Sequence, residues 1–471
     1  MQIAKKTVLT NTARTTLGIS ARTVEDALLE LHKNDNDNFA IGDIKNTTRV
    51  INDANWHKCD GSYLLTNVST DIKNTLTRQN QIKLSTGIMQ DTNGTNWTYY
   101  SDSSYVIIGS SYSITNAGGW AKLFVYTRNE AGDIVANSQK TLRSWGDKYS
   151  MAWPGPIIKC GSYYYTVVKY DDEDSEGLDT RYWHLYYTTN PTGTWSSRQI
   201  WSGGDSNRYL NGLYTNGSTV RLEISSYNNA SASNPKAVTV YTFSGDTSNI
   251  TSSSYNITIS INDVTHNDEY NIYPMGDGKY FRLVSSFGRL TYKSSFTATS
   301  WTQVDPPSWA NAIWGVYYMN GKYYAIFEKD NGSNPYTFVF AWASSLNTLL
   351  TSTEANLSHI EWVSYAQPAR CYGFANSVIW SIAEDRTTVE STTTYKVYLI
   401  ALTENGIKKL LVDDTHTWRN NYTYLITNSS NYTAVLHNTS SDLRNSFYFI
   451  GLSYPDMTNE PYDAYMKIAT N

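Results

Sequence analysis

The sequence predicts a mainly β protein whose C-terminal part is a six-bladed β-propeller. Three observations indicate this fold: a recurring hairpin pattern, a second pair of strands after each hairpin, and a composition rich in aromatic residues. Of the 471 residues, 14% are aromatic, 39 are Tyr and only 17% are charged. Aromatic and β-branched residues favour strands, whereas Asn, Ser and Gly favour the turns between them.

The clearest hairpin runs from Trp314 to Asp330. Two runs of aromatic and β-branched residues flank Asn320-Gly321, and an Asn-Gly pair supplies the positive φ angles of a type I′ turn. The pattern recurs at roughly 45 to 60 residues, which is in the period range of propeller blades. The five further copies span residues 155–171, 210–227, 271–287, 370–385 and 423–438.

A looser pair of strand-like segments follows each hairpin, for example at residues 182–195 and 198–201, or at 289–295 and 300–304. Each unit therefore has four short strands, which is one blade. One alternative is a long β-sandwich with accidental similarity between its parts. A second alternative is a propeller of seven blades, because residues 123–135 look like the outer pair of one more blade.

Composition and charge exclude several classes of protein. The net charge of −5 argues against a nucleic-acid partner, which needs clustered Lys and Arg. Three cysteines, Cys59, Cys160 and Cys371, lie far apart and indicate neither a disulfide framework nor a zinc site. No apolar run is long enough to span a membrane, and no apolar stretch follows the first residues, so we do not expect secretion by a signal peptide.

The N-terminal 45 residues contain one predicted helix, from Thr23 to Lys33. Thr23 can cap this helix. Val24, Leu28 and Leu31 lie at i, i+4 and i+7 and form one apolar stripe. A helix of this length is marginal by itself, so the stripe must be covered. We expect self-association around it as a short bundle; docking on the next domain is the alternative.

The segment from Ile19 to Asn34, ISARTVEDALLELHKN, resembles the connector segments of bacteriophage tail fibres. This resemblance implies that residues 1–45 attach the protein to other virion proteins and form a homo-oligomer, with a trimer expected. It further implies a virion location, in a tail fibre or another external appendage.

Residues 46–148 are expected to form a small β domain, with strands near residues 56–66, 103–114 and 122–135. The arrangement resembles the jelly-roll modules of phage tail and baseplate proteins, many of which are similar to carbohydrate-binding modules. The expected domains are therefore an attachment segment at 1–45, a β-sandwich at 46–148 and a propeller at 149–471.

The loops of the predicted propeller differ between its two faces. Turns between the first and second strands are tight, whereas loops between the second and third strands are long and dissimilar, and binding usually resides on such loops. Aromatic rings stack on sugar faces, and Asn and Asp hydrogen-bond to hydroxyls. The candidate ligand-binding residues are Tyr170, Asp171, Asp172, Tyr182, Trp183, Tyr227, Asn228, Phe287, Asp330, Asn331, Asp385 and Arg386. Alternatively, the aromatic residues belong to the cores of the blades.

An enzymatic alternative rests on three glutamates, Glu223, Glu328 and Glu384, which recur in or just after second strands. Paired carboxylates near a central channel could hydrolyse a glycoside. The Asp-box of sialidases, S-x-D-x-G-x-T-W, does not occur, so no catalytic residue is assigned. We assign no cofactor or metal either: the acidic loop from Asp171 to Asp179 could hold Ca²⁺ but lacks the EF-hand order.

These observations predict a phage appendage protein that binds a glycan on the host cell surface and is not an enzyme. The first alternative is a propeller glycoside hydrolase that acts on envelope polysaccharide. The second is a purely architectural virion protein, such as a head fibre or a baseplate component.

Overall fold

The structure is a computed structural model. It describes residues 43–47, 51, 56–59, 82–88, 95–145 and 151–467, with gaps between strands inside the last two ranges. These gaps are 103, 115–117, 129–133, 174–178, 204–208, 226–230, 232–233, 259–271, 284–287, 330–334, 366–370, 373, 376–377, 390–391, 417–422, 428–433, 439–445 and 453–462. The predicted helix with Val24, Leu28 and Leu31 lies outside the described residues.

The chain divides into two compact units, one of residues 1–83 and 452–471 and one of residues 84–451. The first unit contains a three-stranded antiparallel sheet in the order β1 (Ile44–Thr47), β32 (Asp463–Lys467), β2 (Trp56–Lys58). Its middle strand comes from the end of the chain and its outer strands from the beginning. The second unit is therefore inserted, in sequence, between two strands of one sheet.

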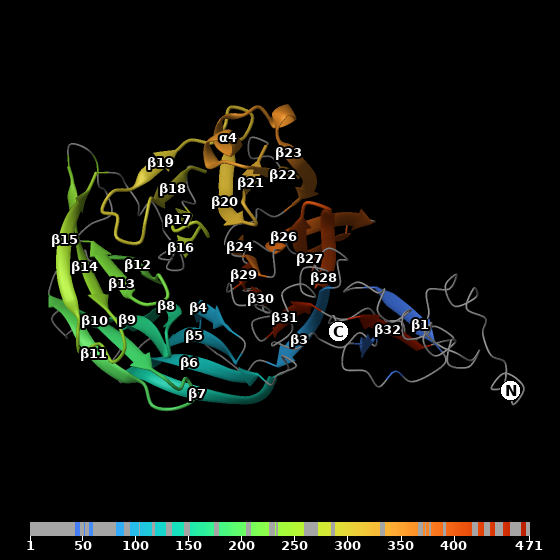
Figure 1. Ribbon diagram of the computed structural model, residues 1–471. Coiled ribbons are helices and arrows are strands. Elements are labelled where there is room, and N and C mark those ends of the chain that lie inside the picture. Colours follow the sequence, from blue (N-terminus) through green and yellow to red (C-terminus); the bar gives the residue numbers. More distant parts are fainter. Residues whose placement is uncertain are drawn as a thin grey trace, which may run out of the picture. The chain divides into compact units, whose positions relative to one another are not determined.

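The second unit contains seven sheets within the described residues, and Figure 1 shows them following one another in the order of the chain. Six are four-stranded antiparallel sheets. The first is β4 (Thr95–Ser101), β5 (Tyr105–Ile114), β6 (Gly118–Arg128) and β7 (Ile134–Trp145); the second is β8 (Met151–Cys160), β9 (Tyr163–Glu173), β10 (Asp179–Thr188) and β11 (Ser196–Gly203); the third is β12 (Tyr209–Thr215), β13 (Val220–Ser225), β14 (Lys236–Phe243) and β15 (Thr251–Ile257).

The remaining sheets repeat this plan, and the last one is closed by a strand from the beginning of the unit. The fourth sheet is β16 (Tyr273–Pro274), β17 (Tyr280–Leu283), β18 (Leu290–Lys293) and β19 (Thr302–Val304); the fifth is β20 (Ala312–Met319), β21 (Lys322–Glu328), β22 (Tyr336–Ala343) and β23 (Ser358–Ser364); the sixth is β25 (Phe374–Ala375), β26 (Val378–Val389), β27 (Thr392–Thr403) and β28 (Gly406–His416); the seventh joins β24 (Cys371–Tyr372), β29 (Thr423–Thr427), β30 (Ala434–Asn438), β31 (Ser446–Leu452) and β3 (Ile82–Ile88).

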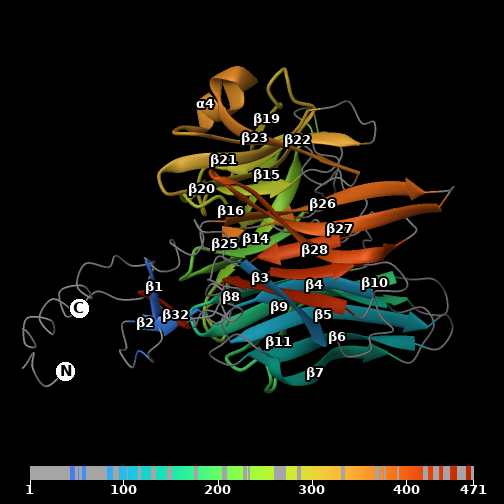
Figure 2. The ribbon, with the colours of Figure 1, turned by 90° about the vertical axis from the view of Figure 1, so that its right-hand side faces the viewer.

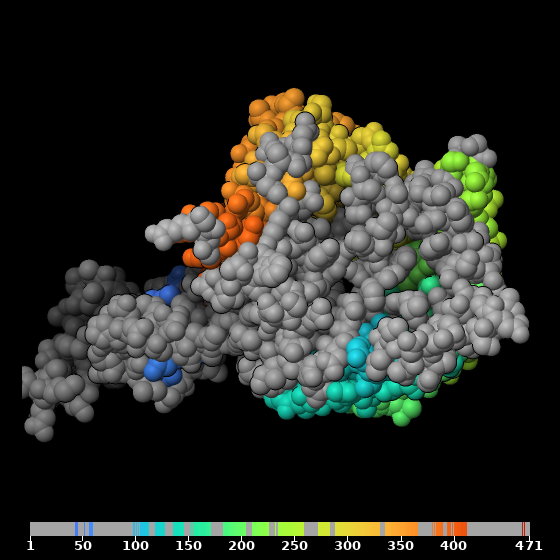
Figure 3. All heavy atoms as spheres, turned by 180° about the vertical axis from the view of Figure 1, so that it is seen from behind, coloured from blue at the N-terminus to red at the C-terminus, as the bar shows by residue number. Residues whose placement is uncertain are grey.

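Neighbouring sheets pack face to face through buried apolar side chains. Leu123 of the first sheet and Val168 of the second share one cluster, and Val167 of the second shares another with Leu222 of the third. Strand β29 of the seventh sheet contacts β26 of the sixth and β4 of the first. The stack therefore closes into a ring, which is the arrangement of a β-propeller. Figure 3 shows the same succession of colours on the surface.

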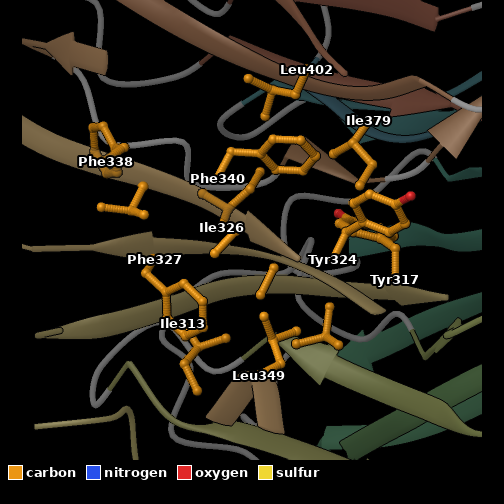
Figure 4. Packing of buried hydrophobic residues seen from close by; sticks show 14 of the residues in the cluster. Ile313, Tyr317, Tyr324, Ile326, Phe327, Phe338, Phe340, Leu349, Ile379 and Leu402 are labelled. Atoms are coloured by element: carbon orange, nitrogen blue, oxygen red, sulfur yellow. The ribbon is translucent and has the colours of Figure 1, made fainter. Parts of the chain in front are cut away.

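The largest cluster given by the described residues joins the fourth, fifth and sixth sheets. Figure 4 labels its members from the fifth and sixth sheets and from α4. Phe281, Phe340 and Leu402 are each at most 2% exposed and come from these three sheets in turn. The short helix α4 (Leu346–Thr351) covers this cluster with Leu349, and Ser345 caps the helix by accepting a hydrogen bond from the Thr348 N–H. The only other described helix is the 3₁₀ turn η2 (Glu354–Asn356). Among the described residues, no helix has the length and apolar character needed to cross a bilayer.

Tyrosines at the start of second strands connect the tight turns of neighbouring sheets. The Tyr164 hydroxyl donates to Asp102 at 2.7 Å, and the Tyr323 hydroxyl donates to Asp277 at 2.5 Å. The Tyr280 hydroxyl donates to the Thr215 carbonyl at 3.1 Å. In each case the acceptor lies at the end of the first strand, or in the turn, of the preceding sheet. Tyrosines at the start of second strands therefore connect successive sheets of the ring.

The predicted hairpin at Asn320-Gly321 is confirmed. Both residues have positive φ, 52° and 77°, and Met319 pairs directly with Lys322 across them. The hairpin of residues 370–385 corresponds to β25 and β26, which pair only at Phe374–Ile379 and Ala375–Val378. Strand β26 then continues beyond the expected end and pairs with β27 as far as Val389 and Thr392. Figure 2 shows these two strands as long adjacent arrows.

The region expected to be a β-sandwich is arranged differently. Residues 95–145 form one four-stranded sheet with the same order as the sheets that follow it, not two facing sheets. Strands β4, β5 and β6 pack against β8, so this sheet belongs to the ring, and the expected boundary at 148/149 lies inside the second unit. Isolated polar residues such as Asp102 had obscured the hairpin; its carboxylate caps the turn by accepting from the Ser104 and Tyr105 N–H groups.

Candidate functional site

A stripe of aromatic and basic side chains lies between the first and second sheets. We call it the aromatic stripe, and it consists of Arg143, Trp145, Tyr170, Tyr182, His184 and Tyr186. Arg143 and Trp145 come from β7, the outermost strand of the first sheet. The other four come from β9 and β10 of the second sheet.

The alternation of side chains along a strand explains the stripe. Tyr182, His184 and Tyr186 are two residues apart on β10, so they point to the same side of the sheet. Tyr170 on β9 pairs directly with Tyr182, and their rings stack with centroids 6.0 Å apart. Tyr170 is buried, whereas Tyr182 and His184 are half-buried. The stripe thus has a closed base and a partly open outer part.

Arg143 is the charged residue of the stripe. Its guanidinium lies over the Tyr170 ring, 4.0 Å from the ring centroid, which is a cation–π contact. Burial, and then the nearby Arg143 charge, hold the pKa of His184 below its usual value. At neutral pH His184 is therefore an uncharged ring, and Arg143 is the only cation among these six residues.

Two N–H groups of the stripe have no acceptor. The Arg143 Nε and the Trp145 Nε1 are enclosed and form no hydrogen bond in the described part of the chain. By contrast, the Tyr186 hydroxyl donates to the Leu142 carbonyl at 2.7 Å, and burial raises the pKa of this hydroxyl. An enclosed donor without an acceptor is costly, so these two groups make this interface less well satisfied than one whose donors are all bonded.

Four of the predicted ligand-binding residues lie at or beside this stripe. Tyr170 and Tyr182 belong to it. Asp171 and Asp172 follow Tyr170 in β9, where their backbones pair with those of Arg181 and Thr180, so the expected loop begins later than predicted.

Trp183 lies apart from the stripe. It is buried on the opposite side of β10 in the core shared with the third sheet, where the alternative interpretation as blade core is the correct one.

The other predicted residues are not brought to the stripe. Asp385 and Arg386 lie on β26 of the sixth sheet, where Asp385 pairs with Lys409 at 3.2 Å and Arg386 lies over the Tyr365 ring. The remaining five residues are outside the described part of the chain: Tyr227, Asn228, Phe287, Asp330 and Asn331.

Sequence reasoning missed Arg143, Trp145 and His184. The signal for His184 was present, because Tyr182, His184 and Tyr186 alternate with apolar residues in the sequence. Arg143 and Trp145 also lie two residues apart, but they come from the region that was expected to be a separate domain. Only the packing of the first sheet against the second brings them to Tyr170.

A second polar cluster lies between the third and fourth sheets and is centred on Glu223. The Glu223 carboxylate accepts from the Tyr214 hydroxyl, the Tyr255 hydroxyl and the Arg221 Nε, each at 2.7 Å, and from the Lys293 Nζ at 2.5 Å. The side chains of Glu223 and Lys293 are 0% exposed.

Burial raises the pKa of Glu223, but the charges of Lys293 and Arg221 outweigh burial and lower it overall. Burial lowers the pKa of Lys293 to about 8. Both residues are therefore charged at neutral pH.

The three glutamates of the enzymatic alternative lie in three different sheets, and no described contact joins any two of them. Glu223 lies on β13, Glu328 on β21 and Glu384 on β26, each buried in a different sheet. Glu328 accepts from the Trp314 Nε1 at 3.0 Å. Glu223 is saturated by four donors. All three carboxylates are buried, whereas the flanking pair of a glycoside hydrolase must reach its substrate.

One group of described residues has the spacing of metal ligands: Glu354, His359 and Glu361. The Lys329 ammonium already lies between the two carboxylates, 2.8 Å from Glu354 and 2.9 Å from Glu361. A protein cation thus neutralises this group. The acidic loop considered for Ca²⁺ lies partly outside the described residues, at 174–178.

Comparison with known proteins gives no match to a family model and none to a curated protein. Among solved structures, the chain is similar to a Trypanosoma rangeli sialidase in complex with sialic acid, with 12% identity, a TM-score of 0.31, and coverage of 78% of this chain and 60% of that one. The chain thus spans less than two thirds of that sialidase.

Two further structures are similar over most of their own length. A thermostable family-43 glycoside hydrolase has 11% identity and a TM-score of 0.28, covering 69% of this chain and 96% of that one. The WD40 domain of SCAP from fission yeast has 11% identity and a TM-score of 0.32, covering 91% and 99%. Likenesses of this size carry no functional argument.

Proposed function

We propose that the protein is a β-propeller of seven blades that binds carbohydrate, and that the aromatic stripe contacts the sugar. The observation that carries this proposal is the combination of the half-buried Tyr182 ring with the half-buried guanidinium of Arg143, which forms no ion pair with a described residue. Aromatic faces favour the apolar face of a pyranose, and N–H donors favour its oxygen atoms.

The finer part of the proposal is that this propeller is displayed on a bacteriophage virion and binds a host surface glycan. It rests on the resemblance of residues 19–34 to tail-fibre connectors. The insertion of the second unit into the sheet of the first agrees with display, because two chain segments connect the units instead of one. A homo-oligomer, expected to be a trimer, would multiply the affinity of each stripe.

Glycoside hydrolysis is the competing function. The described groups that most resemble a catalytic nucleophile are the hydroxyls of Tyr214 and Tyr255. Each donates a hydrogen bond to the Glu223 carboxylate. Burial and the Glu223 charge raise the pKa of both hydroxyls, which is the opposite of nucleophile activation. Because Glu223 is also closed to solvent, this cluster holds two sheets together and does not act on a substrate.

The test compares two tyrosines of the same strand. Tyr182 points into the stripe, whereas Tyr187 points to the opposite side of β10 and packs near Tyr163. We expect Tyr182→Ala in the full-length protein to weaken binding to envelope polysaccharides about fivefold per site, from ~1 kcal/mol of stacking. Tyr187→Ala is the matched control and should leave binding unchanged.

Four results would change the proposal. Equal loss in both variants would mean that the effect comes from misfolding, and unchanged binding in both would remove the stripe as the sugar site. Release of reducing ends from the same polysaccharide by the wild type would favour the hydrolase. Absence of any binding, in adsorption competition as well, would favour a purely architectural protein.

A further inference from the structure

We propose that the aromatic stripe recognises an anionic sugar, specifically the carboxylate of a uronate-type residue, and that Arg143 is the group that selects it. This inference rests on the proposed carbohydrate binding and names its ligand class. It follows from the unpaired charge of Arg143, from the paired donors of its guanidinium, and from the contrast with Arg221 and Arg289, which form ion pairs.

Arg143 carries a charge that nothing in the described part of the chain neutralises. Arg221 pairs with Glu223, and Arg289 pairs with Asp305 at 2.5 Å. Arg198 donates to the Thr247 carbonyl at 2.6 Å. Arg143, in contrast, has neither an ion pair nor a hydrogen bond among the described residues, although it is half-buried. A half-buried cation without an anion favours an anionic ligand.

The guanidinium of Arg143 suits a carboxylate. Its central carbon lies 4.0 Å from the centroid of the Tyr170 ring. A planar guanidinium presents paired N–H donors that match the two oxygens of a carboxylate. Nε is enclosed, so a ligand would be bound through the terminal nitrogens of this half-buried side chain.

The neighbouring residues make the stripe selective rather than simply basic. His184 is uncharged at neutral pH because burial and Arg143 lower its pKa, so Arg143 is the only cation among the six residues of the stripe. The whole chain has a net charge of −5, which repels polyanions at long range. Binding of an acidic chain therefore requires a local contact. Tyr182 offers a ring for the sugar face and Arg143 a donor for its carboxylate, and both contact Tyr170.

The test uses capsular oligosaccharides that contain glucuronate or galacturonate. Each is immobilised in its native form and after reduction of its carboxylates to primary alcohols, and a sulfated oligosaccharide is added as another anion. We expect the full-length protein to bind the native form at least tenfold more tightly than the reduced form, as for other hydrogen bonds to charged groups. The sulfated chain should bind more weakly, since its oxygens are not planar.

Two variants assign this preference to one residue. Arg143→Gln should lower binding of the native form to about that of the reduced form, and should weaken binding of the reduced form far less, because only the native form carries the carboxylate. Arg143→Lys keeps the charge but not the paired donors, and should lie between the two. The unfolding temperature of each variant shows that the ring is intact, and Tyr182→Ala should weaken binding to both sugar forms equally.

The outcomes separate this inference from the proposed function. Equal binding of native and reduced forms, with loss only in Tyr182→Ala, overturns the role of Arg143 and leaves carbohydrate binding in place. Equal binding of the uronate and sulfated chains overturns the selection of carboxylate over other anions. If no member of either set binds, the proposed function fails, and this inference fails with it.

Discussion

The interface between the third and fourth sheets and the interface between the first and second are both rich in Tyr, Arg and charged partners. They differ in how their polar groups are satisfied. Glu223 has four donors and no exposure, and Lys293 opposite it is equally buried. The aromatic stripe instead has a cation without an anion and two N–H groups without acceptors.

This difference separates a structural cluster from a binding surface. A buried network in which each member is satisfied rigidifies the sheets that contribute to it. A half-open network with unpaired groups contributes less to folding, and its open part can be used by a ligand. Residue types alone do not distinguish the two cases, because Arg and Tyr occur in both. The two cases are distinguished by whether each donor and acceptor has a partner.

The largest expected effect is at the saturated cluster. Lys293→Met removes the buried ammonium, so the buried Glu223 carboxylate loses one of its two cationic partners. We expect the free energy of unfolding to fall by about 3–5 kcal/mol. Urea unfolding at pH 7 measures this change. Lys159→Met is the matched control, because the Lys159 side chain is 37% exposed where it pairs with Asp102; it should cost less than about 1 kcal/mol. Similar losses in both variants would show that the Glu223 cluster is not special.

Substitution of Asp102 should cause the next largest loss of stability, because this residue links the first sheet to the second by hydrogen bonds. It accepts from Tyr100, Tyr164, Lys159 and two backbone N–H groups. Burial raises its pKa, but these donors outweigh burial and hold the pKa below the usual value of 3.8. The stability that Asp102 contributes is therefore complete above about pH 4 and is lost as the pH falls through its lower value in the folded protein.

Asp102→Asn tests this linkage. At pH 7 we expect the substitution to cost about 2 kcal/mol, since hydrogen bonds to a charged acceptor are lost. The difference from the wild type should shrink between pH 4 and pH 2, because the wild-type carboxyl is then protonated too. Denaturant unfolding across this pH range measures it. A difference that stays constant down to pH 2 would mean that the charge of Asp102 does not matter.

Arg143→Gln should have a much smaller effect on folding. Its contact with Tyr170 is a partly exposed cation–π pair worth about 1 kcal/mol, and no ion pair with another described residue is lost. We therefore expect the unfolding free energy to change by about 1 kcal/mol or less, while binding of an acidic sugar changes strongly. A loss as large as that of Lys293→Met would make Arg143 a structural residue and would weaken the distinction between the two interfaces.

The repeat was readable from the sequence because it depends on local chemistry. Asn320-Gly321 specifies its own turn, and the alternating residues of β21 and β22 specify strands. The first sheet was not recognised because its hairpin contains Ser101 to Ser104, which look polar and unpaired. Asp102 has its partners in the next sheet, at Tyr164 and Lys159. Contacts that lie about 60 residues away in the chain leave no local pattern.

The candidate site was predictable only in part, for the same reason. Tyr170 and Tyr182 could be found because both border an expected loop on strands that the repeat predicts. Trp183 was included with them, although strand alternation sends it to the opposite core. Arg143 could not be found from the sequence. It is singled out because it contacts Tyr170 of the next sheet and forms no ion pair with a described residue, and both facts require the packing of the two sheets.

The smallest expected effect is at Asp385, a predicted ligand-binding residue in the sixth sheet. It forms a partly exposed pair with Lys409 at 3.2 Å, and exposed pairs contribute about 0–1 kcal/mol. Asp385→Asn should therefore change the unfolding free energy by less than about 0.5 kcal/mol and should leave sugar binding unchanged, because β26 does not contribute to the stripe. The same urea and glycan-binding measurements check both parts. If Asp385→Asn weakened binding as much as Tyr182→Ala, the binding surface would include the extended strands β26 and β27, and the stripe would be only one part of it.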